Sequence, residues 1–266
     1  MQGTAPRSRF LRRFTLSSDE HPFIGRIYDL SVVEMSFDSY VKLASYADCR
    51  YVLHVNDALS TLVQRVESLN MVGSLLWPTP LPNDSFGLSI SLFEWLTVAA
   101  DVFLMRYISV LDCVVIVTNE VYECGLERRK CSIENLKRKG VATGIIALLT
   151  ELQTDQGDLR DERNARFHHG VERALTVDDD IFRLASAFKV RGTFADGRRI
   201  NIQRTFKEGL VELQREFNRV GRALARQLDR LYDLLGVEFE NRFSPKFRVG
   251  FGAKQRLGGT GTPSPD

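Results

Sequence analysis

The sequence DLRDERNARFHHG, residues 158–170, is the stretch on which the prediction of the fold depends. It is dense in charge and contains two of the four histidines of the chain. Asp158 is a suitable N-cap, acidic residues follow it in the first turn, and Gly170 comes directly after the last periodic residue. We therefore expect a single helix that begins near Asp158 and ends at Gly170.

The spacing of polar residues along this helix predicts a chemical site. Arg160, Asn164 and His168 lie four residues apart and therefore share one face. Asn164 can hydrogen-bond a ring nitrogen of His168 and fix its tautomer. Arg163 lies about 100° around the helix from Asn164, but its long side chain can still reach toward the imidazole. His168 is preferred over His169, because Asn164 lies one turn before it.

An imidazole beside a guanidinium suits phosphate chemistry. Arginine binds a phosphate through two hydrogen bonds and stays charged, and histidine exchanges a proton near neutral pH. Such a pair can cut RNA without a metal, because the base removes the proton of the ribose 2′-hydroxyl and the cation stabilises the charge on the pentavalent phosphate.

The segment 163–168, Arg-Asn-Ala-Arg-Phe-His, resembles the R-x4-6-H motif of HEPN domains in the form that has Asn after Arg. Arg160-Asp161 before it and His169-Gly170 after it are also similar to that superfamily. HEPN proteins are helical bundles, often dimeric. Many are metal-independent ribonucleases of toxin–antitoxin, abortive-infection and CRISPR-associated systems, in which the motifs of two protomers meet across a dimer groove.

The resemblance implies a role for each residue of the motif. Arg163 and His168 would be catalytic, and Asn164 would orient the histidine. The further candidates for substrate contact are Arg160, Arg166 and His169. The same residues also fit a solvated helix face, in which Glu162 and Arg166 form an i,i+4 pair and the histidines cap the helix.

Composition limits the class of protein only loosely. The chain has 266 residues, of which 44% are hydrophobic and 26% charged, as in ordinary globular proteins. A net charge of +2 is too small to indicate nucleic-acid binding by itself. Local basic clusters at residues 128–130 and 137–139 fit contact with an RNA backbone and fit a solvated surface equally well.

We expect no metal site, no bound cofactor and no membrane-spanning helix. The four cysteines, at positions 49, 113, 124 and 131, form no C-x-x-C pair, so we predict no metal site, no cofactor and a reducing, cytoplasmic location. The longest uncharged stretch is shorter than a membrane span and contains three prolines, and the N-terminus lacks the apolar core of a secretory signal.

Hydrophobic periodicity predicts a chain of helices. We expect long helices over residues 40–70 and 89–122, and a last one with a near-heptad repeat from Phe206 to Leu235. The polar residues Asp101, Arg106 and Asp112 interrupt the apolar centre of the second long helix, where a solvated edge is favoured over a polar site. Shorter helices are expected over residues 132–140, 141–152 and 178–187.

Strands are expected in two places. Ile27, Val32 and Val33 suggest one or two short strands between residues 21 and 37. A β-hairpin is predicted near residues 188–203, because Asp196-Gly197 is a good turn between two alternating segments.

These patterns together predict a mainly α protein, a HEPN-like helical bundle with long helices and a small β-hairpin. We expect a flexible basic arm over residues 1–20, one domain over 21–250 and a disordered tail over 251–266. The expected function is a homodimeric, metal-independent endoribonuclease that acts on RNA, a toxin or phage-defence effector with an antitoxin or defence partner. The alternatives are a non-catalytic HEPN-like module that binds RNA or protein, and a helical interaction protein without an active site.

Overall fold

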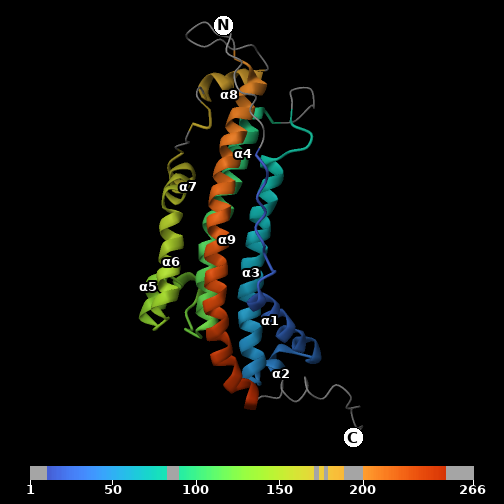
Figure 1. The fold of residues 1–266 in the computed structure, drawn as a ribbon, viewed down its shortest axis with the longest axis vertical. Coiled ribbons are helices and arrows are strands. Elements are labelled where there is room, and N and C mark those ends of the chain that lie inside the picture. The colour runs from blue at the N-terminus through green and yellow to red at the C-terminus, as the bar shows by residue number, and fades with distance from the viewer. Residues whose placement is uncertain (1–10, 83–89, 171–173, 177–178, 189–199, 250–266) are drawn as a thin grey trace. The chain divides into compact units, whose positions relative to one another are not determined.

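The computed structural model describes residues 11–82, 90–170, 174–176, 179–188 and 200–249. These residues are mainly helical, as expected, and include no strand (Figure 1). The elements are α1 (Pro22–Ser31), η1 (Val32–Ser36), α2 (Tyr40–Ala44), α3 (Ala47–Leu76), α4 (Leu92–Val121), η3 (Arg128–Lys130), α5 (Ile133–Arg138), α6 (Thr143–Asp155), α7 (Gly157–His169), α8 (Asp179–Phe188) and α9 (Ile202–Val249). No helix in these ranges is both long and apolar enough to cross a membrane.

The long helices agree with the predicted periodicity. The first is divided into α2 and α3 by a short break before Ala47, and α4 begins and ends within three residues of the expected bounds. The helix α9 extends beyond the predicted range at both ends. The predicted start of α5 is confirmed, because the Ser132 hydroxyl accepts a hydrogen bond from the Asn135 N–H at 3.2 Å.

The expectation of strands between residues 21 and 37 is wrong, because this segment forms α1 and η1. His21 caps α1 by accepting a hydrogen bond from the Phe23 N–H, and Pro22 occupies the first turn. The buried residues of α1 repeat at helical spacing: Phe23, Ile24, Ile27 and Leu30. The cap and this spacing outweigh the β-branched residues on which the prediction of strands was based.

The β-hairpin predicted near residues 188–203 lies for the most part outside the described residues, which omit 189–199. Of the described residues in this range, Ile200 and Asn201 belong to no helix or strand, and the others are helical. Phe188 is the last residue of α8, and Ile202 is the first residue of α9.

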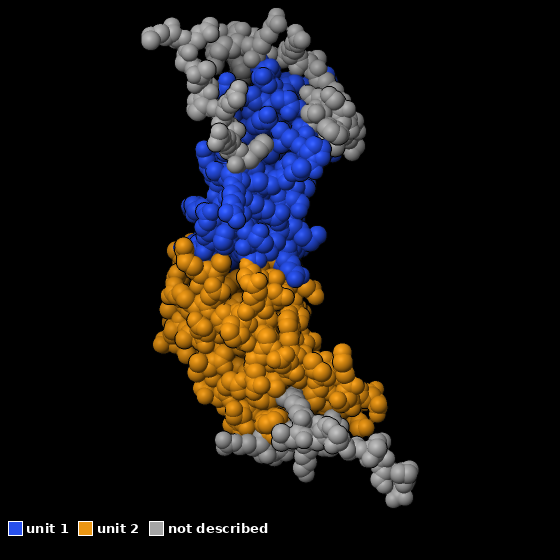
Figure 2. Space-filling model, turned by 45° about the vertical axis from the view of Figure 1, so that its right-hand side comes forward, with its two compact units in different colours: residues 1–16, 67–108, 155–224 blue, residues 17–66, 109–154, 225–266 orange. Residues whose placement is uncertain are grey.

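The chain forms two compact units, which are coloured separately in Figure 2. Unit 1 contains residues 1–16, 67–108 and 155–224, and unit 2 contains residues 17–66, 109–154 and 225–266. The helices α3, α4 and α9 each contribute residues to both units.

Each unit has its own aromatic core. In unit 1, the ring of Phe103 on α4 lies 5.8 Å from that of Phe217 on α9. In unit 2, Tyr51 on α3 stacks on Phe239 of α9 at 5.3 Å, and its hydroxyl donates to the carbonyl of Val121 at 2.8 Å. Residues of α4 and α9 therefore meet inside unit 1, and residues of all three long helices meet inside unit 2.

Residues 11–16 of unit 1 form an N-terminal strap, although the sequence predicts a flexible arm there. Amide side chains bind its backbone: Asn70 of α3 exchanges two hydrogen bonds with Leu16, and Asn218 of α9 accepts from the Phe14 N–H at 2.8 Å and donates to the Arg12 carbonyl at 2.9 Å. Gly221 allows this approach, because a Cβ there would lie 3.2 Å from the Phe14 ring.

Candidate functional site

The candidate site lies on α7 in unit 1. This helix begins at Gly157, after Gln156 rather than with the expected cap Asp158, which lies in the first turn instead. At its other end Gly170 adopts a left-handed conformation with φ 65°, and its N–H donates to the Ala165 carbonyl. The end of the helix, where the two histidines lie, is therefore well defined.

Arg160 is directed back toward the start of α7. One of its terminal nitrogens, Nη2, donates to the Gln156 Oε1 at 3.1 Å. Gln156 is fully buried and donates from its Nε2 to the carbonyl of Tyr107 on α4 at 2.9 Å. The guanidinium of Arg160 therefore belongs to a network that joins α7 to α4.

Arg166 also joins these two helices. Its side chain is only 3% exposed, and its Nε and Nη2 lie 2.7 and 2.6 Å from the Asp101 Oδ1 of α4. The expected i,i+4 pair with Glu162 is present at 3.9 Å. Asp101, which the sequence assigned to a solvated edge, is therefore the partner of a buried arginine 65 residues away in the chain.

Arg163 differs from these two arginines. Its side chain is half-buried, and its Nε, like that of Arg160, is buried without a hydrogen-bond partner among the described residues. No ion pair of its guanidinium is present in the described part of the chain. Among the described residues, Arg163 is thus the arginine of α7 that no carboxylate or amide engages.

The two histidines lie side by side at the end of α7 and are exposed. The centroids of the His168 and His169 rings are 6.5 Å apart. Within the described residues, Asn164 makes no hydrogen bond to His168, so the amide does not hold the imidazole in one chain. Arg163 and His168 are five residues apart, and their Cα positions therefore differ by about 140° around the helix.

Three exposed apolar side chains lie on α4 and α7 close in sequence to Asp101 and Arg166. Val98 and Met105 lie on α4, one turn before and one turn after Asp101, and Phe167 lies beside Arg166 on α7. All three side chains are substantially exposed. We call Val98, Met105 and Phe167 the α4–α7 apolar surface.

The basic clusters of unit 2 carry acidic residues of their own. Arg129 and Lys130 on η3 pair with Glu127 at 2.9 and 3.5 Å, and Arg138 on α5 pairs with Glu134 at 3.2 Å. Their surfaces are therefore less positive than the sequence runs suggest. In the described residues no group of three or more His, Cys, Asp or Glu is arranged to hold a metal ion.

Comparisons with protein-family models, with curated proteins and with solved structures found no match for this chain.

Two contacts of the site were missed by sequence reasoning, the Arg166–Asp101 pair and the contact of Gln156 with Tyr107. The only signal for the first was a charged residue, Asp101, in the largely apolar centre of helix α4, where Arg106 and Asp112 give the same signal.

Proposed function

We propose that the protein is a metal-independent endoribonuclease of the HEPN type, active as a homodimer in the cytoplasm, where it serves as a toxin or phage-defence effector. The proposal rests on the motif and on how the three arginines of α7 are used. Arg160 and Arg166 bind Gln156 and Asp101 of their own chain, whereas no carboxylate or amide among the described residues binds Arg163, which we propose takes a phosphate. The observation that carries the argument is that, among the described residues, no carboxylate or amide binds the guanidinium of Arg163, whereas Gln156 binds that of Arg160 and Asp101 binds that of Arg166.

Arg163 and His168, the proposed catalytic pair, point in different directions from the same helix. A separation of about 140° around α7 does not favour one phosphate touching both Arg163 and His168 of the same helix. A second copy, docked on the α4–α7 apolar surface, would bring its own motif to the same groove. Burial of exposed Val98, Met105 and Phe167 would stabilise that arrangement.

The proposed reaction is attack of the ribose 2′-oxygen on the adjacent phosphorus. His168 of one copy removes the 2′-hydroxyl proton, and the P–O5′ bond breaks as the new P–O2′ bond forms. The 5′-oxygen leaves with a proton from the imidazolium of the other copy. Arg163 stabilises the charge on the phosphate, and the products are a 2′,3′-cyclic phosphate and a 5′-hydroxyl.

Roles for the remaining residues follow from their contacts. Asn164 would orient the histidine of the assembled site, and His169 would contact substrate from the exposed end of α7. The sequence predicts substrate contact for Arg160 and Arg166. We propose instead that they are positioning residues, because both bind groups that hold α7 on α4.

The test is cleavage of mixed RNA by the purified protein in EDTA. We expect 2′,3′-cyclic phosphate products from the wild type and a loss of about 10²- to 10⁴-fold in rate for His168→Ala. Arg163→Ala should lose cleavage while keeping its far-UV circular dichroism. The matched control is Arg204→Ala, an exposed arginine of α9 paired with Glu208, which should cleave as the wild type does.

Other outcomes separate the alternatives. Persistent cleavage by an Arg163→Ala, His168→Ala double variant would exclude this motif as the active site. RNA binding without turnover by every form would favour the non-catalytic module. Absence of both binding and cleavage would favour a helical interaction protein.

A further inference from the structure

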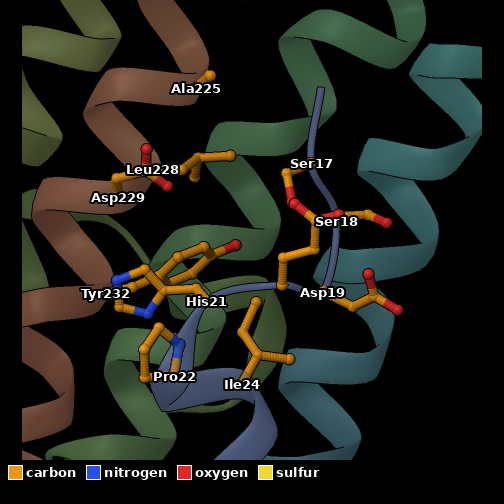
Figure 3. Close-up of a pocket in the computed structure, with 11 residues that line it drawn as sticks. Ser17, Ser18, Asp19, His21, Pro22, Ile24, Ala225, Leu228, Asp229 and Tyr232 are labelled. Atoms are coloured by element: carbon orange, nitrogen blue, oxygen red, sulfur yellow. The ribbon is translucent and has the colours of Figure 1, made fainter. Parts of the chain in front are cut away.

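A cavity of about 300 Å³ lies in unit 2, between the start of α1 and the middle of α9 (Figure 3). Its apolar part is formed by Pro22, Ile24, Ala225, Leu228 and the ring of Tyr232. The volume is at the lower end of the range for ligand pockets, about 300–1,000 Å³. The cavity therefore has the size for a small molecule, and its walls include carbon surface that a hydrocarbon chain can cover.

The hydroxyl of Tyr232 faces this cavity without a partner. The residue is 4% exposed, and its hydroxyl makes no hydrogen bond within the described part of the chain. Figure 3 shows it directed toward the space between Leu228, Ile24 and Ser17. The ring of a buried tyrosine packs against apolar groups while its hydroxyl turns to where it can form a hydrogen bond, which here is the cavity. The ring is held by His21 at 5.3 Å and Phe23 at 6.1 Å.

His21 forms a wall of the cavity and is not a free cation there. Its Nδ1 accepts a hydrogen bond from the Phe23 N–H at 3.2 Å, so this nitrogen carries no proton. Its Nε2 lies 3.3 Å from the Asp233 Oδ1, which suits donation from a neutral imidazole. Both nitrogens are thus engaged away from the ligand space.

The charged groups around the cavity are acidic. Asp19, Glu20 and Asp229 line it, and no Lys or Arg does so among the described residues. The Ser17 hydroxyl donates to one oxygen of Glu20 at 2.9 Å, which holds that carboxylate at the cavity. The resulting negative potential favours a cation.

We infer that this cavity binds a small aliphatic amine. One ammonium group would donate to the Tyr232 hydroxyl and to the Glu20 carboxylate, and a second would lie at the rim beside Asp229. The apolar wall favours an organic cation with a carbon chain over a bare metal ion. This site is built from unit 2 alone, and it does not rest on the proposed ribonuclease activity.

The test is isothermal titration of the full chain with cadaverine, an unbranched diamine, and with pentane-1,5-diol, its uncharged analogue. Saturable binding of one cadaverine per chain is expected, with affinity for the diol at least about tenfold weaker. Tyr232→Phe keeps the ring and removes the hydroxyl, so it should weaken cadaverine binding about two- to tenfold. Asp229→Asn should weaken it about two- to fivefold, since that carboxylate is exposed.

Asp112→Asn is the matched control, because Asp112 is an exposed carboxylate of α4 that does not line the cavity. It should bind cadaverine with wild-type affinity. The inference is overturned if the wild type shows no saturable binding, if the diol binds as well as the diamine, or if both cavity variants keep wild-type affinity. Asp229→Asn changes only an exposed group, so it remains informative even if Tyr232→Phe disturbs the packing of the ring.

Discussion

The buried guanidinium of Arg166 is one of the groups that hold α7 on α4. Two of its nitrogens approach one oxygen of Asp101, whose side chain is 29% exposed. Removing one partner of such a pair leaves the other charge without compensation in a largely dry environment. We therefore expect Arg166→Ala to lower the free energy of unfolding by about 2–4 kcal/mol, measured by urea denaturation.

The control for this prediction is an arginine whose ion pair is exposed. Arg215 pairs with Glu212 at 3.0 Å on the surface of α9, and both side chains are exposed. Arg215→Ala should change stability by less than about 1 kcal/mol. Equal effects of the two substitutions would contradict a structural role for the Arg166–Asp101 pair.

At the level of single residues, sequence reasoning located the motif but not its surroundings. The i,i+4 spacing of Glu162 and Arg166 on one helix sufficed to predict their contact, because helix geometry is local. The Asp101 partner is 65 positions away, and its identity depends on how α4 and α7 pack. Hydrophobic periodicity predicts which face of each helix is buried. It does not predict which turn of α4 packs against which turn of α7.

At the level of secondary structure, the N-terminal strap is held by side-chain amides. Asn218 provides two hydrogen bonds to its backbone, and no strand pairing satisfies those groups. Asn218→Ala should therefore release the strap and lower stability by about 1–3 kcal/mol. The measurement is limited trypsin digestion, which should cut after Arg12 or Arg13 faster in the variant.

The matched control for the strap is Gln153→Ala, an exposed amide on α6. It should be digested at the wild-type rate. If Asn218→Ala is also cut at the wild-type rate, its two hydrogen bonds do not retain the strap.

Helices were predicted well where periodicity was long, and α5 was also predicted from its serine cap, but α1 was not predicted. The helix α4 was found from its apolar run, and α9 from its near-heptad spacing. The helix α1 was missed, because its signal is the cap at His21 followed by Pro22 rather than a long repeat. The strap was missed for a different reason, since an extended segment bound by amide side chains has no periodic signature.

At the level of the whole molecule, buried tyrosines in both units make stability sensitive to high pH. Burial raises the pKa of Tyr107 to about 12, and burial also raises the pKa values of Tyr51 and Tyr232. The native state keeps protons that the unfolded chain releases near pH 10. The stability that these neutral phenols contribute is therefore fully present below about pH 10 and falls as the pH rises toward 12.

Urea denaturation at a series of pH values from 8 to 12 measures this loss. For Tyr107 the expected contribution is about 2–3 kcal/mol by pH 12. Tyr107→Phe should make the decline between about pH 10 and 12 shallower by that amount. An unchanged slope in the variant would show that the pKa of Tyr107 is the same in the folded and the unfolded state.

The proposed homodimer makes the last prediction, which concerns assembly. Met105 is 44% exposed on the α4–α7 apolar surface, one turn from Asp101. A glutamate there would be buried without a partner in the dimer, which should raise the dimer dissociation constant by at least about 100-fold. Sedimentation should show twice the 30.2 kDa chain mass for the wild type and the single-chain mass for Met105→Glu.

The control is Met35→Glu, because Met35 is 89% exposed on η1 and belongs to unit 2. This variant should remain dimeric and should cleave RNA as the wild type does. Since each site is proposed to need the motif of both copies, Met105→Glu should lose cleavage together with the dimer while its helices remain folded. Cleavage by a wild-type monomer, or by monomeric Met105→Glu, would show that one chain is sufficient, and Arg163 and His168 of the same helix would then have to act on one phosphate.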